Sequence, residues 1–229
     1  VVIGELPEAA VEVITQRAGE LGSSLWRFGI EVRWEGSTVI TPIAEHPNIH
    51  PALVGLRQDV NAAIAIAALD ACGAPIKNDA FERGCAKTFV PGRFQIEIID
   101  GVTVVFDGAH NQESSLLLAG AIRKRFPSQP VTLVTNMLTG HEPSDFYAPL
   151  IPLCDRAHIP PIDFHRARTP DDMAANLTQL GLPATPNTSI VEALREAINT
   201  SRGGVVLVTG SYYLVGDALR ALASGKLTV

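Results

Sequence analysis

The sequence predicts an α/β fold in which a mainly parallel β-sheet carries helices on its faces. From about residue 89 onward, short apolar strand patterns alternate with longer helical patterns. Strands separated by helices of this length pair in parallel, because each helix returns the chain to the same edge of the sheet. The pattern is different before that point. We therefore predict a domain boundary near residue 88, with domains at 1–88 and 89–229.

The first domain is predicted to combine short strands with three helices. Pro7 occupies the first turn of a helix over 7–21. The apolar face of that helix is expected to contain Ala10, Val13, Ile14 and Leu21. A second helix, over 62–71, is apolar all round, which predicts burial on every side. The other expected elements are strands at 1–3, 24–28 and 30–34, a turn at 36–37, a loop at 42–51 and a short helix at 78–86.

The second domain is predicted to begin with a β-hairpin. Asp100 and Gly101 separate two strand patterns, at 94–99 and 102–106, and Asp-Gly is typical of a two-residue hairpin turn. The remaining strands are expected at 131–135, 158–162 and 205–209. The helices are expected at 113–126, 144–153, 171–180 and 189–201, with a last helix ending at 222.

Composition limits the classes of function. The 229 residues carry a net charge of -6, and nucleic-acid binding needs a basic face. Three widely spaced cysteines without a CxxC pair favour a reduced, cytoplasmic protein. No apolar run has the length of a membrane span, and the first residues lack the features of a signal peptide. The chain starts without Met on a strand pattern, as expected of a piece of a longer protein.

Residues 107–111, Asp-Gly-Ala-His-Asn, are the first candidate for chemistry. They follow an expected strand and precede an expected helix, and ligands of open α/β sheets bind at such places. A carboxylate, an imidazole and an amide can hold a charged or hydroxylated ligand there. A purely structural interpretation is equally open: Asp107 caps the turn, Gly108 provides a tight bend and Asn111 caps the helix.

Three further segments each allow a ligand-binding and a structural interpretation. Arg93 offers five fixed donors to a phosphate or carboxylate, or it forms a surface ion pair. Ser211 lies between a strand and a helix, where it can receive an anion or serve as the N-cap. Gln58 and Asn61 share one helix face, where two amides can contact a purine edge or cap the start of the helix.

Other signals are weak. His46 and His50 lie in a predicted loop without a third metal ligand in range. Neither a GxxxxGK[ST] phosphate loop nor a GxGxxG fingerprint occurs in the sequence. Asp107, His110 and Ser211 contain the residue types of a hydrolase triad, but Ser211 is not in a GxSxG elbow.

The order of these segments resembles that of folylpolyglutamate synthases, a branch of the Mur ligase superfamily that includes dihydrofolate synthases. The matching segments are QDVNAA at 58–63, PGRFQ at 91–95, FDGAHN at 106–111 and VTGSYYLVGD at 208–217. The resemblance covers essentially the whole chain. It implies that 1–88 is the incomplete C-terminal part of a Mur-type central ATP-binding domain. It further implies that 89–229 is a Rossmann-like Mur ligase C-terminal domain.

The resemblance also implies an activity, in which ATP drives addition of L-glutamate to dihydropteroate or to the γ-carboxylate of folates through an acyl phosphate. ATP and Mg²⁺ are the implied cofactors, with the metal ligands upstream of this chain. Asn61 is implied at the adenine side of ATP, Arg93 at its phosphates and Asp107 at the nucleotide. His110 is implied near ATP or the incoming glutamate, where we expect a catalytic role, and Ser211 near the glutamate. These clusters are expected to converge on one crevice.

Several departures from the family pattern limit what this chain is expected to do alone. The phosphate loop, the Mg²⁺ ligands and the family's modified lysine are not in this sequence, so we expect no turnover and weak ATP binding. Arg57 stands where the family often has His, and residues 139–145 replace the usual Lys-Asp segment. Two alternatives are a non-catalytic nucleotide- or glutamate-binding module and one half of a split ligase with a separate N-terminal half. A cell-wall Mur ligase is disfavoured by residues 212–216. Dihydrofolate synthase and folylpolyglutamate synthase activity are not distinguished.

Overall fold

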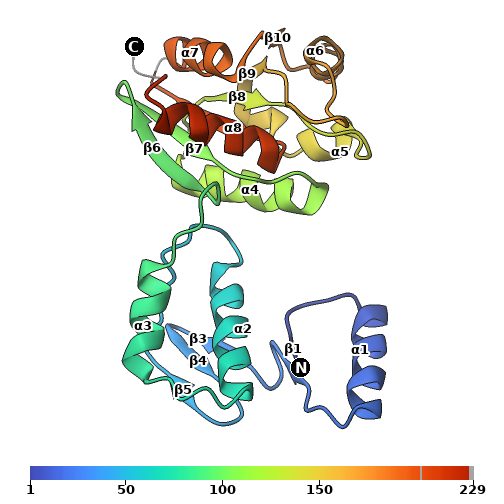
Figure 1. Ribbon diagram of the computed structural model, residues 1–229, viewed down its shortest axis with the longest axis vertical. Helices are drawn as coiled ribbons and strands as arrows, with labels where there is room; N and C mark the ends of the chain where they lie inside the picture. The colour runs from blue at the N-terminus through green and yellow to red at the C-terminus, as the bar shows by residue number, and fades with distance from the viewer. Residues whose placement is uncertain (202, 227–229) are drawn as a thin grey trace. The chain divides into compact units, whose positions relative to one another are not determined.

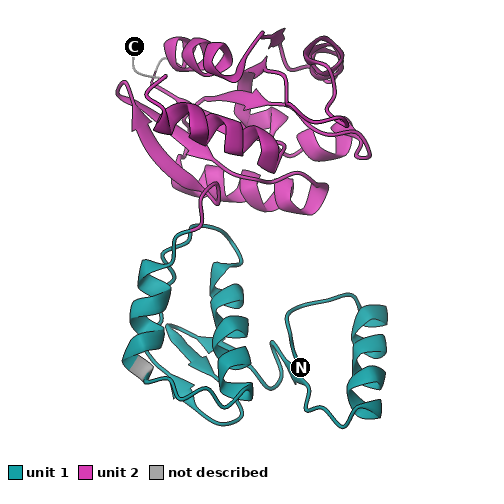
Figure 2. Ribbon diagram, in the orientation of Figure 1, with its two compact units in different colours: residues 1–89 teal, residues 90–229 magenta. Residues whose placement is uncertain are grey.

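The computed structural model describes residues 1–201 and 203–226, and the chain forms two compact units. Unit 1 comprises residues 1–89 and unit 2 comprises residues 90–229 (Figure 2). Each unit has its own hydrophobic core. None of the helices in the described residues combines the length and the hydrophobicity that a membrane span requires.

Unit 1 contains two small sheets and three helices (Figure 1). Its elements are β1 (Val2–Ile3), α1 (Glu8–Glu20), β2 (Trp26–Arg27), β3 (Arg33–Glu35), β4 (Thr38–Ile40), β5 (Glu45–His46), α2 (Gln58–Ala71) and α3 (Asn78–Lys87). The strands β1 and β2 pair in parallel, whereas β3, β4 and β5 form an antiparallel sheet. The core gathers where α2 packs on this second sheet and on α3.

The segment predicted as a loop at 42–51 contains strand β5, so that prediction was wrong in part. His46, in β5, is buried, and its Nε2 lies 2.8 Å from Oδ2 of Asp70 in α2. The same carboxylate oxygen accepts a hydrogen bond of 2.7 Å from the Thr41 hydroxyl. This tertiary contact holds the segment against α2, and a local sequence pattern does not register it.

The predicted burial of α2 on every side was wrong. In α2 only Ala63, Ile66 and Ala67 are buried, while Leu69 is exposed. Within unit 1 the helix packs on β1, β3, β4 and the core residues of α3, and this leaves part of its surface exposed. The expected apolar face of α1 is also open to solvent, because Val13 is 68% exposed and Leu21 is 62% exposed. Ala18 is the buried residue of that helix.

Unit 2 is built on a six-stranded sheet with the strand order β10-β9-β8-β11-β7-β6. Its elements are β6 (Gln95–Ile99), β7 (Val102–Phe106), α4 (Gln112–Arg125), β8 (Val131–Thr135), α5 (Pro143–Tyr147), η1 (Ile151–Leu153), β9 (Cys154–Ile159), α6 (Pro170–Gln179), β10 (Ala184–Pro186), α7 (Ile190–Thr200), β11 (Val205–Thr209) and α8 (Tyr212–Ala223). All strand pairs except β6–β7 are parallel, which confirms the predicted fold class.

The predicted hairpin is present between β6 and β7. Its central residues have positive φ angles, 51° at Asp100 and 79° at Gly101. A type I′ turn requires left-handed backbone at both positions, and its twist matches that of the strands it joins. The ladder runs from the pair Ile99–Val102 to the pair Gln95–Phe106. The hairpin therefore brings the segment before β6 beside the segment after β7.

The region between β8 and β10 differs most from the predictions. The expected helix at 144–153 is the single turn of α5 and the short 3₁₀ turn η1. The strand expected at 158–162 is β9, which begins at Cys154 and ends at Ile159. Pro160 and Pro161 follow, and proline cannot donate to a sheet ladder. The short edge strand β10 was not predicted.

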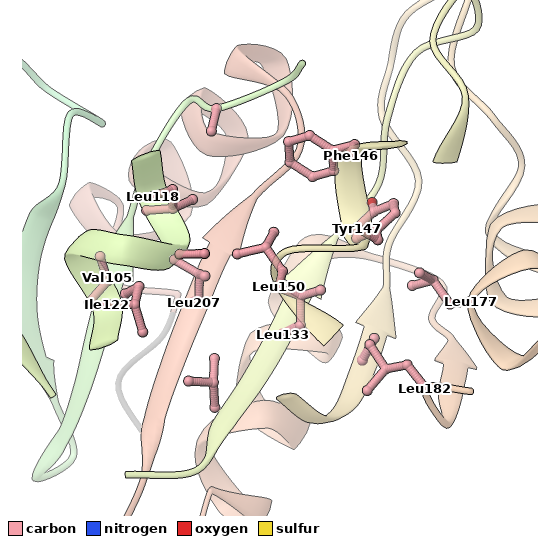
Figure 3. Packing of buried hydrophobic residues seen from close by; sticks show 14 of the residues in the cluster. Val105, Leu118, Ile122, Leu133, Phe146, Tyr147, Leu150, Leu177, Leu182 and Leu207 are labelled. Carbon is pink, nitrogen blue, oxygen red and sulfur yellow. The ribbon is translucent and has the colours of Figure 1, made fainter. Parts of the chain in front are cut away.

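Alternate residues of the central strands point to two hydrophobic layers. Val105, Leu133 and Leu207 face the layer formed with α4, α5 and α6, which Figure 3 shows from close by. Their sequence neighbours, among them Val104 and Val206, face α7 and α8 on the other side (Figure 1). Because successive side chains of a strand point to opposite faces, a sheet covered on both sides is apolar at every position. This double layer fixes the carboxyl ends of β7, β8 and β11 at one edge of unit 2.

Candidate functional site

A cavity of about 380 Å³ opens in unit 2 where several strands end. Segments that follow β7, β8, β9 and β11 line it, so residues far apart in the sequence meet there. The lining residues are His110, Leu138, Thr139, Gly140, His141, Arg166, Gly210, Ser211, Tyr212 and Tyr213. This is the location at which open parallel sheets bind ligands. Three of the residues have nitrogen-containing side chains that donate hydrogen bonds, and none has a carboxylate.

Asp107 is not among the residues that line this cavity and is 7% exposed. Its Oδ2 accepts a hydrogen bond of 2.9 Å from the amide of Phe94, and its Oδ1 accepts one of 2.9 Å from the amide of Ala109. Burial raises the pKa of the Asp107 carboxyl, while the two amides and the nearby Arg93 act in the opposite direction. The bond from Ala109 caps the turn, as the structural interpretation expects, and the bond from Phe94 also joins the segment before β6 to the segment after β7. Its assignment to the nucleotide stays a prediction.

The backbone beside Arg93 is held in an uncommon conformation. Phe94 has a φ of 45°, which non-glycine residues rarely adopt. Its amide donates the hydrogen bond that Oδ2 of Asp107 accepts. The amide of Gly108 donates a hydrogen bond of 2.9 Å to the carbonyl of Gly92. Gly92 has a φ of 68°, and a Cβ there would lie 2.6 Å from Cγ1 of Val215. These contacts hold the backbone on both sides of Arg93.

Arg93 is exposed and forms no ion pair with any carboxylate of the described residues, contrary to its structural interpretation. Its guanidinium carbon lies 5.9 Å from the centre of the Tyr212 ring. That ring packs so closely on Gly108 that a Cβ there would overlap it. Tyr212 therefore connects Arg93 to the segment that carries His110. The ring centres of Tyr212 and His110 lie 5.4 Å apart.

The imidazole of His110 is held by a backbone carbonyl two residues earlier in the chain. Its Nδ1 lies 2.9 Å from the carbonyl oxygen of Gly108, and since a carbonyl only accepts, Nδ1 carries the hydrogen. In the neutral ring Nε2 then has a lone pair that can accept a proton. The ring of His141 lies 6.4 Å away, centre to centre. The next residue, Asn111, caps α4 through a capping box with Ser114, as predicted.

Ser211 is buried at the start of α8 and lines the cavity. Its hydroxyl accepts a hydrogen bond of 3.2 Å from the amide of Tyr213, so it is the N-cap of this helix. The amide groups of a helix's first turn point toward its N-terminus, where the helix dipole favours an anion. Ser211 thus meets the structural interpretation and remains a candidate for the ligand-binding one.

Asn61 lies on the first turn of α2, in unit 1. Its side-chain amide donates a hydrogen bond of 3.2 Å to Oε1 of Gln58, so the two amides share a face as predicted. Together they line a separate cavity of about 210 Å³, whose wall also contains Ala62, Ala65 and Cys85. Arg93, Asp107, His110 and Ser211 come together within unit 2. The expected convergence of Asn61 with them stays a prediction.

Sequence reasoning missed two cationic or imidazole side chains of the cavity, His141 and Arg166. The segments that carry them meet through an antiparallel bridge between Leu138 and Ala167 and a 2.7 Å hydrogen bond from Thr139 N to Arg166 O. Buried Asn136 adds hydrogen bonds from its Nδ2 to two carbonyls beyond β9. The available signal was that β8 and β9 are consecutive strands of one sheet, whose carboxyl ends are neighbours.

Comparison with known proteins places the chain in a family. Residues 95–221 match the family model described as the C-terminal domain of dihydrofolate synthetase, which is more than half of the sequence. The chain belongs to this family. A curated dihydrofolate synthase/folylpolyglutamate synthase of Escherichia coli is 28% identical over 95% of the chain and 50% of its own length. The Bacillus subtilis protein of the same description is 27% identical over 77% of the chain and 42% of its own length.

Solved structures share the fold of the chain. Escherichia coli FolC in complex with DHPP and ADP has a TM-score of 0.83 and 26% identity, over 94% of the chain and 51% of that protein. A Mycobacterium tuberculosis folylpolyglutamate synthase complexed with ADP and AMPPCP has a TM-score of 0.86 and 23% identity, over 96% of the chain and 54% of that protein. The chain therefore spans about half the length of the relatives it matches.

Proposed function

We propose that this chain is part of an ATP-dependent ligase that adds L-glutamate to dihydropteroate or to the γ-carboxylate of folates. Membership of the dihydrofolate synthetase family supports this activity, and so do the names of the curated relatives. The observation that carries the proposal is the cavity of unit 2. It places His110, Ser211 and Arg166 around one space at the carboxyl ends of parallel strands, without a carboxylate in its lining. Such a lining suits an anionic amino acid.

The proposed reaction has two steps that balance without a redox partner. A carboxylate oxygen of the acceptor attacks the γ-phosphorus of ATP, and ADP leaves. The amine of glutamate then attacks the acyl carbon, phosphate leaves, and the nitrogen loses a proton. We assign Arg93 to the phosphates, because its guanidinium has no carboxylate partner among the described residues. We assign Asn61 to the adenine and Asp107 to the nucleotide end of the site.

We assign His110 and Ser211 to the glutamate. The lone pair that remains on Nε2 of His110 can accept the proton that the glutamate nitrogen loses. Ser211 and the first amides of α8 lie in the cavity wall, where they can orient a carboxylate. Fixed donors around the reacting carbon also stabilise the tetrahedral oxyanion that forms there.

We propose that Mg²⁺, the implied metal, is held by residues other than those that the structure describes. In residues 1–201 and 203–226, no group of three His, Cys, Asp or Glu side chains is placed to hold a metal ion. Magnesium prefers carboxylate ligands in octahedral geometry, and the cavity lining supplies none. We therefore derive no step through the metal from this chain, and we propose that its ligands come from residues outside it.

We propose that the partner of unit 1 is an N-terminal half that carries the phosphate loop, a motif absent from this sequence. Two observations support such a partner. Large apolar side chains are exposed on α1 (Val13), at its C-cap (Leu21) and on α2 (Leu69). The parallel pair of β1 and β2 has two residues in each strand, and parallel strands are ordinarily covered parts of a larger sheet. Without that half we expect no turnover.

We place the enzyme in the cytoplasm. Its three cysteines are free thiols, which suits a reducing compartment, and ATP is the proposed substrate.

The experiment compares two proteins: the purified 229-residue chain and the full-length ligase encoded by the complete gene. Each is supplied with ATP, Mg²⁺, labelled L-glutamate and either dihydropteroate or tetrahydrofolate. We expect ADP and glutamylated product from the full-length ligase and neither from the chain alone. His110→Ala should lower kcat/KM by at least about tenfold. His50→Ala, in an exposed loop of unit 1, serves as the matched control. Failure of the full-length ligase to glutamylate either acceptor would refute the proposed function.

A further inference from the structure

The cavity of unit 2 contains an arginine with no carboxylate partner. Arg166 follows β9 and lines the cavity, yet its guanidinium forms no ion pair within the part of the chain that the structure describes. Its one described side-chain contact is with an aromatic ring, because its guanidinium carbon lies 5.9 Å from the centre of Phe164. An exposed arginine with five donors and no anion to satisfy them is suited to a planar carboxylate.

The backbone of Arg166 is nevertheless fixed. Its carbonyl accepts the 2.7 Å hydrogen bond from the amide of Thr139. Phe164, beneath the guanidinium, stacks on Tyr213 with ring centres 4.4 Å apart and an interplanar angle of 22°. Tyr213 belongs to the first turn of α8 and lines the same cavity. Arg166 is therefore positioned by two of the cavity's own walls.

The neighbouring Arg168 shows what a structural arginine looks like in this segment. Its guanidinium pairs with Asp172 at 3.3 Å and donates a second hydrogen bond of 3.3 Å to the carbonyl of His141. Arg168 thereby holds the segment that carries His141, with protein acceptors for its Nη1 and Nη2. The two arginines lie two residues apart, and the one in the cavity lining is the one without a carboxylate.

We propose that Arg166 is a specificity-determining residue that binds a carboxylate of the incoming amino acid. This inference rests on the proposed function, and it adds a residue that neither the motif resemblance nor the known-protein comparisons assign. The carboxylate takes the place of the missing ion-pair partner, and the guanidinium lies beside the Phe164–Tyr213 stack at the cavity wall. His141 lines the same cavity, with its ring centre 6.4 Å from that of His110, and adds a second donor there.

The test uses the full-length ligase with Arg166→Ala and a series of glutamate concentrations at saturating ATP and acceptor. We expect KM for L-glutamate to rise at least about tenfold, with kcat changed less than about threefold and KM for ATP unchanged. Arg166→Lys keeps the charge but loses the planar pair of donors, so its KM for glutamate should lie between those of the wild-type enzyme and Arg166→Ala. Arg156→Ala is the matched control, because Arg156 is an exposed arginine of β9 outside the cavity.

The outcomes separate this inference from the proposed function. An Arg166→Ala enzyme with the wild-type KM for glutamate, or with a raised KM for ATP alone, would overturn the role of Arg166 and leave the ligase activity standing. A wild-type enzyme without glutamate ligation would remove both. If thermal melting shows that the alanine variant is unfolded, Arg166→Gln is assayed in its place, and the same rise in KM is expected. A wild-type KM in that variant counts against the inference.

Discussion

Replacement of Asp107 tests how the candidate site is assembled. The carboxylate is almost fully buried, and both of its oxygens accept backbone hydrogen bonds of 2.9 Å. One donor is the amide of Phe94, the residue directly after Arg93. We expect Asp107 to act in large part by fixing the backbone of Arg93, so its removal should weaken both the fold and the phosphate contact that we assign to Arg93.

The magnitude follows from the two hydrogen bonds. Alanine at position 107 leaves two buried amides without an acceptor, and each such amide costs about 1–3 kcal/mol. Burial disfavours the charged carboxylate and raises the pKa of Asp107, so removal of that charge offsets part of this cost. We expect a net loss of about 3 kcal/mol in the free energy of unfolding of unit 2. The substitution Asp107→Asn keeps one acceptor and turns an NH₂ group toward the other amide, so this variant should lose about half as much.

Urea unfolding of the 229-residue chain, followed by circular dichroism, measures the stability of these variants. In the full-length ligase, Asp107→Ala should lower kcat/KM by at least about tenfold, which corresponds to about 1.4 kcal/mol. A double-mutant cycle then separates positioning from direct contact. If Asp107 acts through Arg93, adding Asp107→Asn to an enzyme that already carries Arg93→Ala should lower kcat/KM little further. Independent, multiplicative losses would refute the positioning argument, and so would an Asp107→Ala chain with the wild-type urea midpoint.

Three further predictions concern stability. Gly108→Ala should displace the ring of Tyr212 and lower the thermal midpoint, and Tyr212→Ala in the same chain should restore part of the loss, because the added Cβ then has space. Glu31 has a pKa of about 2, lowered from 4.5 chiefly by its hydrogen bond from Arg27, so this pair stabilises the fold above pH 4.5. That stability should be lost as the pH falls from 4.5 toward 2, and a Glu31→Gln chain titrated in parallel should lack this component. Asp70→Ala leaves buried His46 without its carboxylate and should cost about 3 kcal/mol in urea unfolding; a loss below about 1 kcal/mol would contradict the importance of that contact.

The sequence was most informative where local signals and tertiary structure agree. Strands β8 and β11 occupy the predicted residues, because each is an apolar β-branched run covered on both faces. The hairpin between β6 and β7 was predictable from Asp100 and Gly101 alone, since few residues tolerate the left-handed backbone of that turn. These elements set the position of residues 107–111 and of Ser211.

The missed elements are short and depend on partners distant in sequence. Strand β10 has three residues, none of them buried, and pairs with β9 at the edge of the sheet. Strand β5 has two residues and is held through His46 and Asp70. Neither element is long enough for an alternating pattern to appear. Arg166 and His141 were missed for the same reason, because the segments after β8 and β9 meet only once the sheet has formed.

The distribution of the site over the chain has a consequence for the proposed mechanism. All the residues that line the cavity of unit 2 lie between His110 and Tyr213, so the amino-acid end of the site is formed within one unit. The residue assigned to adenine, Asn61, lies in unit 1 and already shares its side-chain hydrogen bond with Gln58. In the proposed mechanism, the adenine contact comes from unit 1 and the phosphate loop from outside the chain, whereas the glutamate carboxylate is bound by residues of unit 2. Substitutions in the cavity should therefore change recognition of glutamate without changing recognition of ATP, and this separation is what the Arg166 variants measure.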